Sequence, residues 1–202
     1  QEILQRYLSL QYYYSTAYDK ILTDDPSVYE TVSIYLKQNQ PSDIEKLFFY
    51  EDELLSLSRL YSVEARLSEA LERRVWLKSG GYLVFDRTEA LTCIDVNSGK
   101  YVGKKNAEET YFEINMEAAR EIGHQLLLRN ISGIIIIDFI NMQTEERRRL
   151  LMEALRSIVS GDPMKTVVVD MTPLGLVEVT RKKEKKSLWE QLHTAGKMGD
   201  QQ

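Results

Sequence analysis

The stretch SGIIIIDFI, residues 132–140, decides the fold class that the sequence predicts. Four consecutive isoleucines are strongly β-prone, and a short apolar run between a Ser-Gly pair and an aspartate is typical of a strand buried on both faces. Helical patterns flank this strand. One runs from about 106 to 129, and the other, from 144 to about 159, carries apolar residues at helical spacing. A buried strand between two long helices predicts a layered architecture of helices on a sheet.

Further strands are predicted on both sides of this helix–strand–helix segment. VWLKSGGYLVFDRTEALTCIDVNSG, residues 75–99, contains two β-prone runs around the glycine-rich turn Ser79–Gly81, followed by a strand that ends at Asp95. KTVVVDM and GLVEVT, residues 165–171 and 175–180, are two more strands. The order β-β-β-α-β-α-β-β predicts an α/β (α+β) domain with a mixed sheet and helices packed on it.

Asp95 and Asp138 share one context, because each ends a β-prone run and precedes a polar loop. If their strands are neighbours, the two carboxylates converge, and like charges at close range repel unless a cation lies between them. Mg²⁺ suits such a site, since it takes one or two carboxylates and keeps several waters. Asn97 points to the same side of an extended chain as Asp95. The alternative interpretation is that both aspartates are turn or cap residues.

Composition limits the classes of protein that this chain resembles. Residues 1–70, which mix helices with short strands, carry 6 Lys+Arg against 12 Asp+Glu, a net of −6, whereas residues 71–202 carry 20 against 19, a net of +1. No apolar run approaches the roughly 18 residues of a membrane span, and no secretory signal is visible. The single cysteine, Cys93, excludes an internal disulfide and favours a reducing, cytoplasmic setting.

Three segments resemble the catalytic core of the ribonuclease E/G family. They are SGGYLVFDRTEALTCIDVNSGK (79–100), EETYFEINMEAAREIGHQLLLRNISGIIIIDFINM (108–142) and GLVEVTRKK (175–183). The resemblance implies that residues 1–70 are a partial RNase H-like segment and that residues 71–192 are a DNase I-like catalytic subdomain. Residues 193–202 are then expected to be a tail.

The resemblance also implies a role for each residue of the candidate site. Asp95 and Asp138 would be catalytic carboxylates that bind Mg²⁺, and Asn97 would hydrogen-bond the scissile phosphate or orient Asp95. Family members cut single-stranded RNA endonucleolytically and leave 5′-phosphate and 3′-hydroxyl ends, as in RNA processing and decay. Glu108 and Asn115, which match the family's EET…N helix, share one helical face. Capping and helix packing are the competing interpretation for them.

RNA contacts are expected from basic residues near the site and near the C-terminus. The candidates are Lys100, Lys104, Lys105, Arg181 and Lys182. The competing interpretation for the run RKKEKK is a solvated face. Because so few basic groups are available, the isolated chain is expected to bind RNA weakly and to cut it poorly.

The sequence departs from the family pattern at its end. SLWEQLHTAGKMGDQQ, residues 187–202, lacks the paired cysteines of the family's zinc link, so a homo-oligomer stays open but a zinc-linked dimer is not expected. The S1 and 5′-sensor segments of the family are also missing and the chain begins at Gln1, as expected of a C-terminal fragment. A non-catalytic RNA-binding or assembly module that keeps the fold is the competing function.

Overall fold

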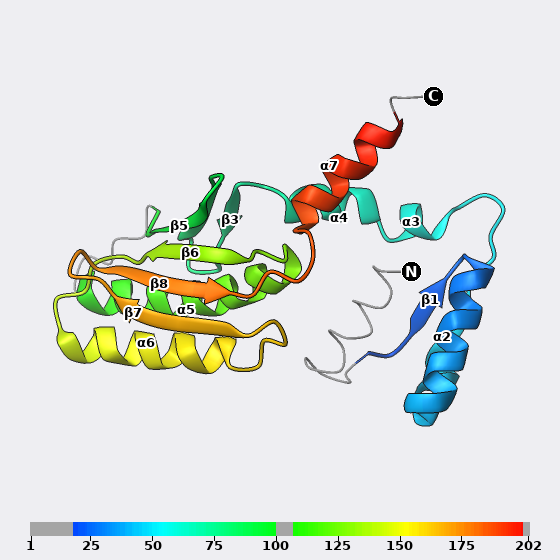
Figure 1. The fold of residues 1–202 in the computed structure, drawn as a ribbon, viewed down its shortest axis with the longest axis horizontal. Helices are drawn as coiled ribbons and strands as arrows, with labels where there is room; N and C mark the ends of the chain where they lie inside the picture. Colours follow the sequence, from blue (N-terminus) through cyan, green and yellow to red (C-terminus); the bar gives the residue numbers. More distant parts are fainter. Residues whose placement is uncertain (1–17, 100–106, 200–202) are drawn as a thin grey trace. The chain divides into compact units, whose positions relative to one another are not determined.

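The computed structural model describes residues 18–99 and 107–199 of the chain (Figure 1). The chain divides into two compact units, residues 1–69 and 70–202. Among the described residues no helix is long and apolar enough to cross a bilayer.

The first unit is built on a two-stranded parallel sheet. Its elements are β1 (Ile21–Thr23), α2 (Pro26–Asn39), the 3-10 helix η1 (Pro41–Lys46), β2 (Leu47–Phe49), α3 (Leu57–Leu60) and α4 (Val63–Ala70), the last reaching the boundary. Asp25 caps the N-terminus of α2, and its carboxylate accepts hydrogen bonds from the backbone amides of Ser27 and Val28. Val32, Leu36 and Leu47 form its small buried core.

The second unit is a mixed six-stranded sheet with the order β3-β4-β5-β6-β8-β7. The strands are β3 (Arg74–Trp76), β4 (Tyr82–Arg87), β5 (Leu91–Asn97), β6 (Gly133–Asp138), β7 (Thr166–Met171) and β8 (Leu176–Arg181). Neighbouring strands are antiparallel except β5 and β6, which are parallel. The connection between them is therefore a helical crossover.

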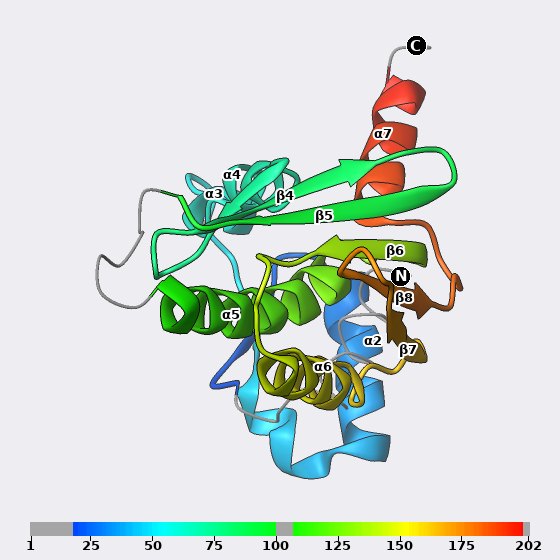
Figure 2. The ribbon, with the colours of Figure 1, turned by 90° about the vertical axis from the view of Figure 1, so that its left-hand side faces the viewer.

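Two long helices cover one face of this sheet. Helix α5 (Ala107–Leu128) is that crossover, and α6 (Glu145–Val159) follows β6. Figure 2 shows both on the same side of the strands. Their apolar faces pack on alternate strand residues, including Leu83, Ile94, Ile135 and Val177, all almost fully buried. The order and type of these elements confirm the α+β prediction.

The opposite face of the sheet is open, which corrects the prediction for the isoleucine run. Ile135 and Ile137 are fully buried against the helices, but Ile134 is 51% exposed and Ile136 is only partly buried. Val167 and Val169 of β7 are also exposed. Strand β6 is therefore buried on one face, and this open face is where the polar strand residues lie.

The C-terminal region contains a further helix. Helix α7 (Leu188–Gly199) includes most of residues 193–202, which the family resemblance implies to be a tail. It begins with a capping box, in which the Ser187 amide donates to the Glu190 carboxylate and the Glu190 amide donates to the Ser187 hydroxyl. These hydrogen bonds and the Arg87 guanidinium lower the pKa of Glu190 to about 2.

Candidate metal centre

Asp95 and Asp138 are register partners on the two parallel strands. Asp95 lies near the end of β5, and Asp138 is the last residue of β6. Side chains alternate along a strand, and the neighbours Ile94 and Ile137 are buried in the core. Both carboxylates therefore project from the open face, on adjacent strands whose backbones are about 5 Å apart. The structure brings together the two acids that the sequence singled out.

Asn97 joins this pair from the same face of β5. Its side-chain amide nitrogen donates a hydrogen bond of 2.7 Å to Oδ2 of Asp95, which fixes the orientation of that carboxylate. Partial burial raises the pKa of Asp138, and the neighbouring negative charge of Asp95 raises it further. A cation that neutralises the pair would therefore stabilise the charged form of Asp138.

The donor set fits a hard divalent cation. Mg²⁺ uses two carboxylates and an exposed surface for water when a substrate phosphate completes its ligands. Apart from the bond from Asn97, no described residue donates a hydrogen bond to these two carboxylates. Within residues 18–99 and 107–199 no cluster of three or more His, Cys, Asp or Glu side chains is placed to hold a metal. A closed site of the structural zinc type is therefore not formed by these residues.

Asn115 fixes the loop that follows Asp138. Its side chain is fully buried on α5, donates a hydrogen bond of 2.7 Å to the carbonyl oxygen of Ile140 and accepts one of 3.0 Å from the Ile140 amide. Ile140 lies two residues beyond Asp138. The Asn115 side chain therefore holds the backbone just beyond Asp138. The sequence places Glu108 and Asn115 on one helix face, but it does not identify this backbone partner.

Glu108 holds the next part of the same loop. Its Oε1 accepts hydrogen bonds from the backbone amides of Gln143, at 3.0 Å, and Thr144, at 3.4 Å. Arg147 lies beside both acids of the motif, with an ion pair to Glu109 and a nitrogen 3.9 Å from Glu108. Glu108 and Asn115 thus act on the loop between β6 and α6 and touch neither aspartate directly.

A second support lies under Asn97, and sequence reasoning did not identify it. The turn between β3 and β4 is held by Glu117 of α5, which accepts from the amides of Lys78 and Ser79. Gly81 ends this turn against β5, and a Cβ atom there would lie 2.8 Å from the carbonyl oxygen of Asn97. The Gly-Gly sequence was identified as a turn, but its close approach to Asn97 depends on the sheet.

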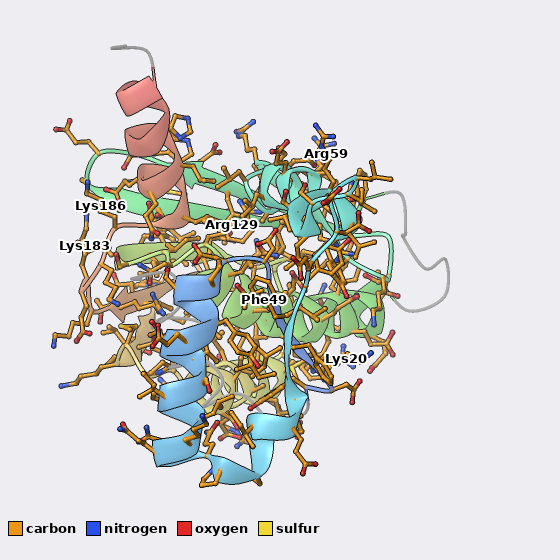
Figure 3. All side chains as sticks on the ribbon, turned by 90° about the vertical axis from the view of Figure 1, so that its right-hand side faces the viewer. Lys20, Phe49, Arg59, Arg129, Lys183 and Lys186 are labelled. Carbon is orange, nitrogen blue, oxygen red and sulfur yellow. The ribbon has the colours of Figure 1, made fainter. Side chains whose placement is uncertain are left out.

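The basic residues expected to bind RNA are not gathered at this site. Lys100, Lys104 and Lys105 lie outside the described residues. Lys182 is exposed and pairs with Glu184. It follows Arg181, at the end of β8 that is far from Asp138. Lys182 is six residues along the strand from Leu176, the register partner of Asp138, which corresponds to about 20 Å. Lys183 and Lys186 continue this exposed segment toward α7 (Figure 3).

Arg181 has a structural place, which corrects its expected role in RNA binding. It is 3% exposed, and its guanidinium forms a two-point ion pair with Asp162 and also donates to Asn130 and to the carbonyl oxygen of Ile131. Burial alone would raise the pKa of Asp162, but hydrogen bonds from Arg181, Thr166 and the Met164 amide outweigh it, and the pKa is lowered. A guanidinium enclosed in this way is not available to a polyanion.

Comparison with known proteins gives a consistent family. Residues 2–184 match the model of the ribonuclease E/G family. The chain is 44% identical to ribonuclease G of Haemophilus influenzae over 179 residues, which is 89% of this chain and 36% of that protein. It is 39% identical to ribonuclease E of Synechocystis over 179 residues, 88% of this chain and 27% of that protein.

A plant protein extends the comparison. The chain is 36% identical over 181 residues to the chloroplastic ribonuclease E/G-like protein of Arabidopsis thaliana, covering 89% of this chain and 18% of that protein. The chain thus spans about a third, or less, of the length of the curated relatives it matches.

Proposed function

The chain belongs to the ribonuclease E/G family, and on that premise we propose that residues 70–202 carry the Mg²⁺ centre of an endoribonuclease. The substrate is single-stranded RNA, which is hydrolysed to 5′-phosphate and 3′-hydroxyl ends. The observation that supports this most directly is the pairing of Asp95 with Asp138 across two parallel strands on the open face of the sheet. Two adjacent acids that form no ion pair with any basic residue in the described part of the chain are an arrangement that a bound cation stabilises.

The side chains of this unit divide the chemistry among them. Asp95 and Asp138 would hold the ion, which when bound supplies Lewis-acid stabilisation of the phosphate and lowers the pKa of a water. Asn97 orients Asp95 through its amide nitrogen, and no described residue bonds to its side-chain oxygen, which would accept from a water or a ribose hydroxyl. Attack by water at phosphorus breaks the bond to the 3′ oxygen, so that the phosphate stays on the 5′ end of the downstream product.

Loop positioning is the second contribution of the chain. Asn115 and Glu108 bind the backbone that follows Asp138. They accept hydrogen bonds from three backbone amides of this loop, those of Ile140, Gln143 and Thr144. Fixing the direction of a metal ligand in this way supports the affinity of the site. Asn115 and Glu108 are positioning residues in this proposal.

Metal binding and cleavage are tested with the variants Asp95→Asn and Asp138→Asn. Asp170→Asn is the matched control, because Asp170 is an exposed acid of the same sheet that has no acidic register partner. We expect both site variants to lose binding of Mn²⁺, used as a spectroscopic substitute for Mg²⁺, and the control to keep it. Cleavage of a labelled single-stranded oligoribonucleotide is measured with the chain in excess, because the activity is expected to be weak.

The outcomes separate the two candidate functions. Loss of both metal binding and cleavage in the site variants supports the endoribonuclease. RNA binding without cleavage, with or without Mg²⁺, in the unaltered chain supports the non-catalytic module instead. Cleavage that survives both substitutions refutes the catalytic assignment of the aspartates.

A further inference from the structure

An aromatic pair lies beside the candidate metal centre on the same open face. Trp76 of β3 is the register partner of Tyr82 of β4, and Tyr82 is the register partner of Asn97. Val75 and Leu83 pack into the core, so alternation places Trp76 and Tyr82 on the face that carries Asp95. The aromatic pair and the amide therefore form one row across three strands.

The geometry of this row is that of an exposed stacking surface. The two rings lie 5.2 Å apart between centroids with an interplanar angle of 58°, and Trp76 is 63% exposed. The guanidinium of Arg74 lies 4.5 Å from the Tyr82 ring and 5.6 Å from the Trp76 ring. Within the described part of the chain no ion pair is recorded for Arg74.

The arrangement calls for a ligand with a flat apolar face and a negative charge. A tryptophan exposed to this degree gains little from folding, because most of its surface stays in water. Arg74 adds a positive charge that no described carboxylate neutralises, and it does so over the aromatic faces. A nucleobase stacks on aromatic rings while its phosphate approaches a cation, which is how single strands are held without sequence preference.

We propose that Trp76, Tyr82 and Arg74 form a subsite that stacks a base of single-stranded RNA and contacts its phosphate, next to the strand-end aspartates. This inference rests on the proposed function, since it deepens the binding of the same substrate. The occupant is RNA because the row is continuous with the proposed cleavage centre and carries the charge that complements a phosphate.

The position of the subsite sets its place on the substrate. Trp76 lies two strands from Asn97, which corresponds to about 10 Å, and Asp95 lies a further two residues along β5. The stacked base is therefore a flanking base and not the one at the bond that is cut. Because every base has an aromatic face, the subsite holds the strand in place without selecting its sequence.

The second tryptophan of the chain is a natural control. Trp189 stacks on His193 at 3.9 Å between ring centroids and has the Arg87 guanidinium 5.1 Å from its ring. It lies on α7, in the part of the chain that follows the end of β8 opposite Asp138. Trp189 is also partly exposed, at 48%, but its ring is stacked nearly parallel on His193, with an interplanar angle of 24°, whereas Trp76 meets Tyr82 at 58°.

The test follows Trp76 fluorescence in the 202-residue chain carrying Trp189→Phe, so that Trp76 is the only tryptophan. A short single-stranded oligoribonucleotide is titrated to about 1 mM, above the usual range of non-specific nucleic-acid binding. An abasic strand of the same length is the comparison. We expect quenching by the RNA and much less by the abasic strand, since the signal requires a base on the ring.

Substitutions measure the share of this contact in RNA affinity. Trp76→Ala is expected to weaken binding, followed by a labelled oligonucleotide, at least about fivefold, the lower limit for the loss of one stacked base. Trp76→Phe should restore most of the affinity, whereas Trp76→Leu, which keeps apolar area without the π face, should not. Trp189→Ala should leave RNA affinity unchanged. Circular dichroism checks that each variant folds.

The results distinguish this inference from the proposed function. Quenching that is equal for RNA and abasic strand, no quenching at all, or unchanged affinity in Trp76→Ala overturns the subsite, whatever happens to metal binding. A change of oligomeric state in Trp76→Ala without a change in RNA affinity also overturns it and makes the face an interface between copies. If the subsite behaves as expected but Asp95→Asn still cleaves, the proposed function fails alone.

Discussion

Replacing Asn115 with alanine tests whether the candidate centre depends on the clamp behind it. The substitution removes both hydrogen bonds to Ile140 and leaves one backbone donor and one acceptor without their partner. A buried unsatisfied group costs about 1–3 kcal/mol. Because Ile140 is only partly buried, water recovers part of that loss, and the free energy of unfolding should fall by about 2–3 kcal/mol.

The assay combines stability with metal affinity. For a unit of this size such a loss lowers the midpoint of thermal unfolding by about 10 °C, measured by circular dichroism. Mn²⁺ affinity should fall about tenfold, the lower limit for the loss of a group that orients a metal ligand. The reason is that the backbone after Asp138 is no longer held at Ile140. Glu113→Ala, at an exposed position of the same helix, is the control. A stability loss below about 0.5 kcal/mol, which is typical of surface substitutions, would refute the clamp.

Two further predictions concern structural residues outside the aspartate pair. Arg181→Met should cost about 3–5 kcal/mol of stability, because it leaves the Asp162 carboxylate buried without its cation. Since the folded-state pKa of Asp162 is lowered, its contribution to the free energy of unfolding is complete above the unfolded-state pKa of about 4. That contribution is lost as the pH falls from there through the folded-state pKa. Urea unfolding between pH 3 and 7 should show this pH dependence in the parent chain and a smaller one in the variant. Gly81→Ala should destabilise the unit and weaken Mn²⁺ binding, because the added Cβ forces the Asn97 carbonyl to move. Gly161→Ala, at a position with open space, is the control and should change neither property. Equal effects of the two glycine variants would contradict the close approach of Gly81 to Asn97.

Local patterns predicted the order of the elements and the two strand-end acids. Local sequence predicts the helix after residue 144 and the strand that ends at Asp138. The signals are hydrophobic periodicity and the residues that interrupt helices and strands, and both depend only on residues near one another in the chain. From the sequence, the pairing of β5 with β6 is only a condition that a metal site requires, and the structure contains that pairing. A sequence pattern contains no information on which strands become neighbours, so the geometry of the site required the structure.

The isoleucine run shows where a local pattern is insufficient. Four adjacent apolar residues are compatible with a strand covered on one face or on both, because alternation is hidden when every position is apolar. The structure covers one face only and leaves Ile134 half exposed. Which faces receive helices is decided by the connections, in this case by α5 and α6 on the same side (Figure 2).

Arg181 illustrates the same limit for charge. Its place in a basic run suggested a solvated, polyanion-binding group, but strand alternation turns it toward the interior, and its partner Asp162 comes from the loop before β7. Long-range partners of this kind leave no mark in the local sequence. Lys182, one residue later, is exposed, as the charge pattern predicted.

The parallel pairing of β5 and β6 determines when the candidate metal centre can form during folding. The two acids are separated in the chain by the whole of α5, so no hairpin or single helix brings them together. Contacts between such distant residues form late, since the entropy of closing a long loop must be overcome first. Cation binding should consequently behave as an all-or-none property of residues 70–202: a nascent or partly denatured chain would have the helices and the isolated strands, yet no affinity for the ion until the crossover has docked.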